Sequence, residues 1–121
     1  MQILVVDDDT LAGAITAAIL ESAGYEPLMA ENGIEALEKL AEVPGIGLIL
    51  SDMNMPFISG MELFQTLRSQ GMETPFILLS GDALAPGDLN AAAPDACLLK
   101  DFDLKKQLLE SVESVLARRR T

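Results

Sequence analysis

The sequence alternates between short apolar runs and longer segments whose apolar residues recur at helical spacing, five times over. The apolar runs cover residues 3–6, 25–30, 47–51, 76–79 and 96–99. Continuous runs of this kind are typical of strands buried on both faces of a parallel sheet. Strand–helix alternation connects such strands by right-handed crossovers, which place helices on both faces. The pattern predicts an α/β fold with a doubly wound, five-stranded parallel sheet, and the proline at position 27 places the second strand at an edge.

Capping signals predict where the first helices begin and end. Asp9 or Thr10 is the expected N-cap of the first helix, and Gly24 its stop. Asn32 with Glu35 forms a capping pair for the second helix. The apolar positions at helical spacing in these two helices are Leu11, Ile15, Ala18 and Ile19, then Ile34, Leu37 and Leu40.

The later helices follow the same logic. Ser59 with Glu62 forms a capping box for the third helix. Between residues 82 and 94, two prolines and Gly87 allow only a short helix, which would start with Pro86. The apolar positions of the third and the last helix are Leu63, Phe64 and Leu67, then Leu104, Leu108, Val112, Val115 and Leu116.

Composition and charge exclude several function classes. A chain of 121 residues is expected to form one domain, 1–121. The net charge of −11 argues against nucleic acid or an anionic membrane as a direct partner and favours a cationic ligand, such as a divalent metal. With no histidine, zinc–histidine sites, serine–histidine triads and histidine phosphocarriers are excluded, and the single Cys97 rules out an internal disulfide. The N-terminal apolar run is too short for a signal peptide or membrane span, so the cytoplasm is the expected compartment.

Groups suited to phosphate chemistry follow four of the predicted strands. They are Asp7 with Asp8, Asp52, Ser80 and Lys100. Because the carboxyl ends of parallel strands share one edge of the sheet, we expect these groups to lie close together. Three neighbouring carboxylates repel one another unless a cation joins them, and magnesium is the usual ion where carboxylates share the metal with water and phosphate. A lysine and a hydroxyl suit phosphate oxygens, so the set predicts a phosphoryl-transfer site with Asp52 as the nucleophile.

Each of these residues alone has a simpler explanation. The acidic run at residues 7–9 could only cap a helix, Ser80 could be a turn residue, and Lys100 could be a solvated surface charge. Cys97 lies in an apolar run and is best explained as an inert core thiol. The functional interpretation therefore depends on the joint pattern.

These motifs closely resemble the receiver domain of two-component response regulators, over essentially the whole chain. The matching segments are ILVVDDD, LILSDMNMPFISGMEL, FILLSG and CLLKDF, in that order. The resemblance implies a flavodoxin-like sheet with strand order 2-1-3-4-5, an order for which a member of this family is a known example. It also implies a signalling module rather than an enzyme, with no output domain in this chain.

The resemblance further implies a role for each matching residue. Asp52 would accept a phosphoryl group from the phosphohistidine of a sensor histidine kinase or histidine phosphotransfer protein. Mg²⁺ would be held by Asp7, Asp8, Asp52 and the backbone carbonyl of Asn54.

The remaining matches concern the response to phosphorylation. Lys100 would pair with a phosphate oxygen, and Ser80 would move with its loop to hydrogen-bond the phosphate and signal to an unknown downstream protein. Asn54 and Asp82 would tune how readily water hydrolyses the acyl phosphate. Hydrolysis would reset this two-state switch.

The sequence departs from the family pattern at three places. Asp101 follows Lys100 where the family usually has proline, so a trans peptide bond and a different loop are expected. Cys97 stands where an aromatic ring commonly couples the loop to the surface. The segment at 82–94 is about two residues shorter than usual.

Two other functions stay open. A pseudo-receiver would keep the fold as an interaction module without switching, which Asp101 and Cys97 would allow. A small phosphatase resembling haloacid-dehalogenase-like hydrolases would use Asp7 as its nucleophile. Against the phosphatase, Leu11 occupies a position that its family fills with threonine or valine, and the further carboxylate, Asp52, precedes Ser80 and Lys100.

Overall fold

The computed structural model describes residues 1–80, 96–99 and 104–120. In chain order the elements are β1 (Gln2–Val6), α1 (Thr10–Ser22), β2 (Glu26–Ala30), α2 (Gly33–Glu42), β3 (Ile46–Asp52), α3 (Gly60–Ser69), β4 (Phe76–Ser80), β5 (Ala96–Leu99) and α4 (Leu104–Arg120). All five predicted strands are confirmed. The short helix predicted within 82–94 lies outside the described residues. Within the described ranges, no helix is long and apolar enough to cross a membrane.

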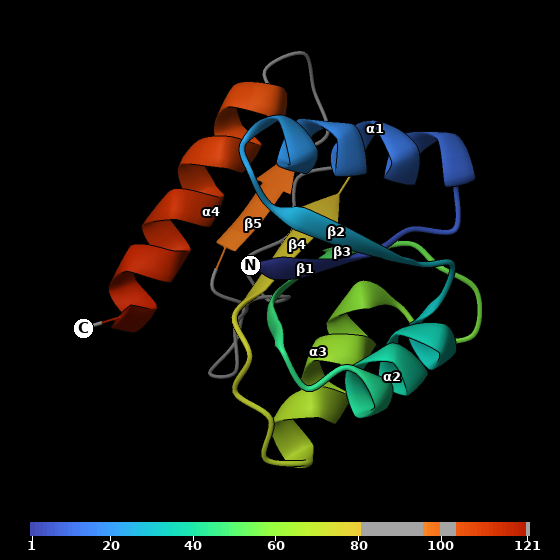
Figure 1. The fold of residues 1–121 in the computed structure, drawn as a ribbon. Helices are drawn as coiled ribbons and strands as arrows, with labels where there is room; N and C mark the ends of the chain where they lie inside the picture. The colour runs from blue at the N-terminus through green and yellow to red at the C-terminus, as the bar shows by residue number, and fades with distance from the viewer. Residues whose placement is uncertain (81–95, 100–103, 121) are drawn as a thin grey trace.

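The strands form one parallel sheet in the order β2-β1-β3-β4-β5, as predicted. β1 lies between β2 and β3, with Leu4 opposite Leu28 on one side and Ile49 on the other. β2 is an edge strand, in agreement with its proline. Figure 1 shows α1 and α4 on one face of the sheet and α2 and α3 on the other. The predicted doubly wound architecture is therefore confirmed.

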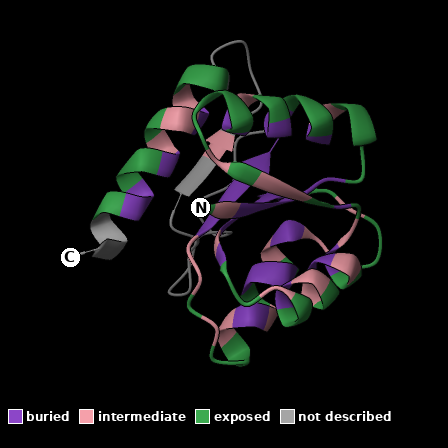
Figure 2. Cartoon of the chain, viewed as in Figure 1, coloured by how far each residue is buried: buried purple, intermediate pink, exposed green. Residues whose placement is uncertain are grey.

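The sheet separates two apolar cores. Alternate residues of each central strand point to opposite faces, so Leu4 and Val6 join the core under α2 and α3, whereas Ile3 and Val5 join the core under α1 and α4. The inward faces predicted for the third and the last helix are confirmed at Leu63, Phe64, Leu67, Leu108, Val112, Val115 and Leu116. Burial concentrates in the strands and on the inner sides of the helices (Figure 2). Each large side chain buried here contributes about 1.5–3 kcal/mol.

Most of the apolar positions predicted in α1 lie outside its buried face, although Ile19 is partly buried against the core under α1 and α4. Leu11 is 70% exposed and Ile15 is 54% exposed. The buried residues of α1 are Gly13, Thr16, Ala17 and Leu20. These are mostly small, which lets the helix backbone approach the edge of the sheet; a Cβ on Gly13 would lie 2.7 Å from the terminal methyl carbon of Met29. Helical spacing predicts the helix correctly, but not which side faces the core.

The start of α2 departs from its predicted face in the same way. The Asn32 side chain accepts a hydrogen bond from the Glu35 amide at 2.8 Å, which confirms the N-cap. Ile34 is predicted on the apolar face, but it is 48% exposed. Gly33 faces inward instead, and a Cβ there would collide with the side chain of Ile58. The missing side chain of Gly33 therefore lets the loop after β3 pack against the first turn of α2.

Candidate functional site

The carboxyl ends of β1 and β3 bring three acidic residues together. The ends are adjacent because Val6 is opposite Ser51 in the parallel register. Asp7, Asp8 and Asp52 each offer a carboxylate oxygen, and these oxygens lie within 4.8 Å of one another. Asp7 is 3% exposed and Asp52 is 8% exposed, whereas Asp8 is open to solvent. The cluster is thus buried on one side and accessible on the other.

The acidic run at residues 7–9 contributes both to the acidic cluster and to the N-cap of α1. The Asp7 amide donates to the carbonyl of Ala30 on β2 at 3.0 Å, and the Asp9 amide donates to Oδ1 of Asp7 at 2.9 Å. The Asp9 side chain accepts from the amides of the first turn of α1 at 3.0 and 3.2 Å, so Asp9, not Thr10, is the N-cap. Asp7 and Asp8 remain as the acidic residues that meet Asp52.

Backbone contacts fix the position of Asp52. The Met53 amide donates to the carbonyl of Leu79 on β4 at 2.8 Å, and the Gly60 amide donates to the carbonyl of Met53 at 2.9 Å. The hydroxyl of Ser51, which is fully buried, donates to the carbonyl of Asp52 at 3.0 Å. Both ends of the loop after β3 are therefore held by hydrogen bonds beside Asp52.

α3 begins where this loop closes. The Ser59 hydroxyl accepts from the Glu62 amide at 3.1 Å, and the Glu62 carboxylate accepts from the Ser59 amide at 3.0 Å. This is the predicted capping box, and it is confirmed. Gly60 at the first helical position allows close approach, since a Cβ there would lie 2.6 Å from Cδ1 of Leu78 and would collide with the carbonyl oxygen of Asp52.

The structure describes some of the other predicted site residues but not all of them. Ser80 is the last residue of β4, the strand next to β3, and it is 5% exposed. Asn54 is exposed in the loop that Asp52 opens. Cys97 lies on β5 opposite Leu78. Lys100, Asp82 and Asp101 lie outside the described residues.

Sequence reasoning missed Phe57. It is 75% exposed, more than any other large apolar side chain described, and its backbone φ is 73°. Among the described residues it is the one non-glycine residue with a positive φ. The available signal was an aromatic residue directly after Met55-Pro56, in the loop that starts at Asp52.

The arrangement suits phosphoryl transfer assisted by a hard cation. Carboxylate oxygens are the preferred ligands of magnesium, and a single divalent ion can bridge groups this close. At these separations the carboxylates repel one another, which makes cation binding favourable. Within the described residues, no buried side-chain oxygen or nitrogen lacks a hydrogen-bond partner.

Comparison with known proteins agrees with this geometry. The family described as response regulator receiver domain matches residues 3–113. The sensor histidine kinase RcsC of Salmonella typhimurium is 36% identical over 113 residues, which is 90% of this chain and 12% of RcsC. The cell cycle transcriptional regulator CtrA of Caulobacter vibrioides is 28% identical over 120 residues, 98% of this chain and 51% of CtrA. The chain thus spans about half or less of these curated relatives.

Solved structures have the same fold. The response regulator protein TrrA of Thermotoga maritima, crystallised in complex with Mg²⁺-BeF, gives a TM-score of 0.85 at 34% identity, over 94% of this chain and 97% of TrrA. The chemotaxis protein CheY4 of Vibrio cholerae gives a TM-score of 0.84 at 30% identity, again over 94% of this chain and 97% of CheY4. The chain belongs to the receiver domain family of two-component response regulators.

Proposed function

We propose that Asp52 is the phospho-acceptor of this receiver domain. The observation that carries the proposal is the meeting of Asp7, Asp8 and Asp52 at the ends of two adjacent strands, with carboxylate oxygens within 4.8 Å of one another. Asp52 stands at the end of β3, on a backbone held by hydrogen bonds on both sides. A nucleophile needs this kind of fixed placement to reach an in-line attack geometry.

The proposed reaction moves one phosphoryl group. A carboxylate oxygen of Asp52 attacks the phosphorus of a phosphohistidine on a sensor histidine kinase or histidine phosphotransfer protein. The P–N bond breaks, its electron pair stays on the imidazole nitrogen, and Asp52 becomes an acyl phosphate. Water later attacks the phosphorus, the P–O bond to Asp52 breaks, and inorganic phosphate leaves, which restores the carboxylate and returns the switch to its starting state.

Asp7, Asp8, Asp52 and the backbone carbonyl of Asn54 would hold Mg²⁺. The oxygen-only donor set and the close approach of the three carboxylates fit this ion. The Mg²⁺-BeF complex of TrrA supports the assignment by similarity. When bound, the ion neutralises negative charge on the carboxylates and the incoming phosphate.

Ser80 and Lys100 would respond to the new charge. Ser80 ends the strand beside Asp52, so its hydroxyl is well positioned to turn toward a phosphate on Asp52. Lys100 is proposed to pair with a phosphate oxygen. Phosphorylation adds about two negative charges at neutral pH, enough to bias a loop that has two arrangements.

The outer face of α1 is a suitable surface for the protein donor. Leu11, Ala14, Ile15 and Ala18 follow one another at helical spacing and all are exposed, as the green outer side of α1 in Figure 2 indicates. An apolar stripe of this kind packs against a partner helix. The stripe begins two residues after the N-cap Asp9, so a helix lying on it can present a phosphohistidine to Asp52.

The test is labelling by a small donor. The protein is incubated with Mg²⁺ and acetyl phosphate, and intact mass spectrometry looks for one phosphoryl adduct that is stable in acid and lost in base. We expect the adduct on the wild type and none on Asp52→Asn. Asp9→Asn is the matched control: it removes a neighbouring carboxylate, keeps a good N-cap, and should label normally.

The outcomes separate the three functions. A wild type that stays unlabelled, under conditions that label another receiver domain, would refute phospho-acceptance and favour a pseudo-receiver. An adduct on Asp52→Asn but not on Asp7→Asn would move the nucleophile to Asp7, as in a phosphatase. EDTA should abolish labelling if the acidic cluster works through a divalent ion.

A further inference from the structure

Phe57 lies at the tip of an unusual turn in the loop that follows Asp52. Its φ of 73° and the hydrogen bond from the Ile58 amide to the Pro56 carbonyl at 2.9 Å together define a γ-turn of the rare, positive-φ kind. This backbone conformation is strained for a bulky residue. Strain held at such a position calls for a functional explanation.

The turn is held on both sides. Met55 and Ile58 are partly buried and pack against the core under α2 and α3, and Ile58 also contacts Gly33 at the start of α2. Pro56 has a fixed φ, and Ser59 is tied into the capping box of α3. The chain therefore turns inward before and after Phe57, which leaves the ring 75% exposed on a rigid support.

Phe57 lies in the loop that begins at Asp52. Phe57 is five residues after Asp52 in the same closed loop. Figure 1 shows that this loop and the β1–α1 loop lie on the same side of the molecule, the side to which the N-terminal end of α1 points. A partner that lies on the α1 stripe and reaches Asp52 must therefore pass close to the β3–α3 loop.

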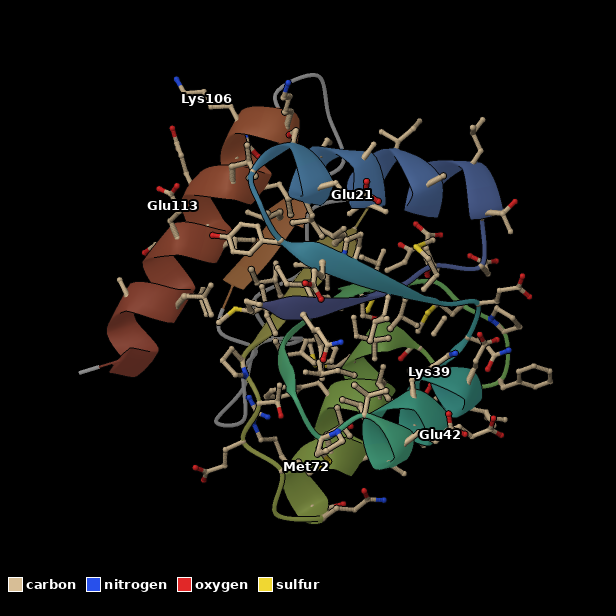
Figure 3. The ribbon with its side chains drawn as sticks, viewed as in Figure 1. Glu21, Lys39, Glu42, Met72, Lys106 and Glu113 are labelled. Carbon is tan, nitrogen blue, oxygen red and sulfur yellow. The ribbon has the colours of Figure 1, made fainter. Side chains whose placement is uncertain are left out.

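The surface beside Phe57 continues onto α2. Ile34, 48% exposed, follows Gly33, which contacts the turn. A shallow groove of about 380 Å³ runs from there along the outer side of α2, between Asn32, Ile34, Glu35, Glu38, Lys39 and Glu42. Lys39 and Glu42 extend from this helix in Figure 3. Three glutamates against one lysine make the groove acidic, and the whole chain carries a charge of −11, which disfavours a second copy as the occupant.

We propose that Phe57 is a specificity-determining anchor for the histidine-phosphorylated protein donor. The ring enters an apolar recess between helices of the donor, and basic residues of the donor lie over the acidic groove of α2. Aromatic side chains presented in a fixed conformation dominate many interfaces, because little freedom is lost when they are buried. This inference rests on the proposed function. It adds a second contact with the protein donor, on the β3–α3 loop and α2, to the one proposed on the outer face of α1.

The test compares two phosphodonors on the same variants. Phe57→Asn removes the ring but keeps a residue that tolerates positive φ, and Phe57→Trp keeps an aromatic ring. Each is phosphorylated by acetyl phosphate and by a purified, histidine-phosphorylated phosphotransfer domain, chosen from a panel as the one that labels the wild type fastest. We expect Phe57→Asn to lower the second-order rate constant of protein-to-protein transfer about tenfold and to change labelling by acetyl phosphate less than twofold.

Two results would overturn the inference. Transfer from the protein donor at the wild-type rate would show that the ring makes no contact that matters. An equal loss with both donors would assign Phe57 to loop geometry instead of docking. Phe57→Trp should retain most of the transfer, which a purely conformational role would not predict. Failure of the proposed function is distinct, because acetyl phosphate would then not label the wild type.

Discussion

Gly60 offers the sharpest test of how the fold positions the acceptor. In Gly60→Ala, the new Cβ would lie 2.6 Å from Cδ1 of Leu78, whereas ordinary Cβ contacts begin at 3.4 Å. The new Cβ and Cδ1 of Leu78 would therefore have to move apart by at least about 0.8 Å. The Cβ also collides with the carbonyl oxygen of Asp52, so part of this displacement falls on the proposed acceptor residue itself.

The magnitude follows from this geometry. Overpacking of this size destabilises a protein by about 1–3 kcal/mol, against a gain of up to about 1 kcal/mol because alanine is the better helix former. We expect a net loss of about 1 kcal/mol, which lowers Tm by roughly 3–6 °C in a domain of this size. Misplacement of a reacting group by about 1 Å can slow a reaction roughly a hundredfold. Labelling by acetyl phosphate should therefore slow by about tenfold or more.

The assay pairs thermal unfolding with the rate of phosphoryl labelling. Gly71→Ala is the control, because Gly71 has a φ of 84° and a Cβ added there would meet no atom within 4 Å. That substitution should destabilise by about 1–2 kcal/mol through backbone strain alone and leave the labelling rate unchanged. A Gly60→Ala protein that melts like the wild type and labels at its rate would refute the claim that close approach at Gly60 positions Asp52.

Three further predictions concern the framework and the ion. The Arg68 guanidinium donates to two backbone carbonyls of the α3–β4 turn, at 2.9 and 3.0 Å, and lies 4.6 Å from the ring centroid of Phe64. Arg68→Ala should therefore lower the free energy of unfolding, measured by urea denaturation, by about 2–3 kcal/mol. A loss below about 0.5 kcal/mol would mean that these contacts are not maintained in solution. Ser59→Ala should lose about 1 kcal/mol, with measurable coupling to Glu62→Ala in a double-mutant cycle; strict additivity would contradict a working capping box. Mg²⁺ at about a hundredfold above its dissociation constant should stabilise the wild type by about 2.7 kcal/mol, and Asp8→Asn much less at the same concentration; equal stabilisation would place the ion elsewhere.

Much of the fold could be predicted because its signals are local. A strand buried on both faces leaves a continuous apolar run, as at residues 76–79, and the structure has a strand there. The capping box of Ser59 and Glu62 spans four residues and needs no tertiary information. The acidic cluster was predictable for a related reason, since parallel strands must end at a common edge and Asp7 and Asp52 each follow such a run.

Other features depend on contacts that the sequence does not reveal. Leu11 and Ile15 have the spacing of a buried face, but α1 approaches the sheet through Gly13 and other small residues, so the larger side chains are left outside. Periodicity identifies a helix, and tertiary packing decides its orientation. Phe57 adopts a positive φ between Met55 and Ile58, which are partly buried against the core under α2 and α3, and no local propensity of phenylalanine would suggest this conformation.

The separation of the two cores constrains what kind of motion can carry a signal through this domain. Along β1, side chains enter opposite cores in strict alternation, and each central strand is paired on both sides. Sliding one strand by a single residue would exchange its two sets of side chains between cores of different shape and break the hydrogen bonds to both neighbours. The sheet is therefore expected to stay rigid. A change in the chemical state of Asp52 must then be transmitted by movement of the loops and helices attached to the edge of the sheet. Sequence variation in those loops and helices can change the partner that the domain recognises while the sheet that carries Asp52 stays the same.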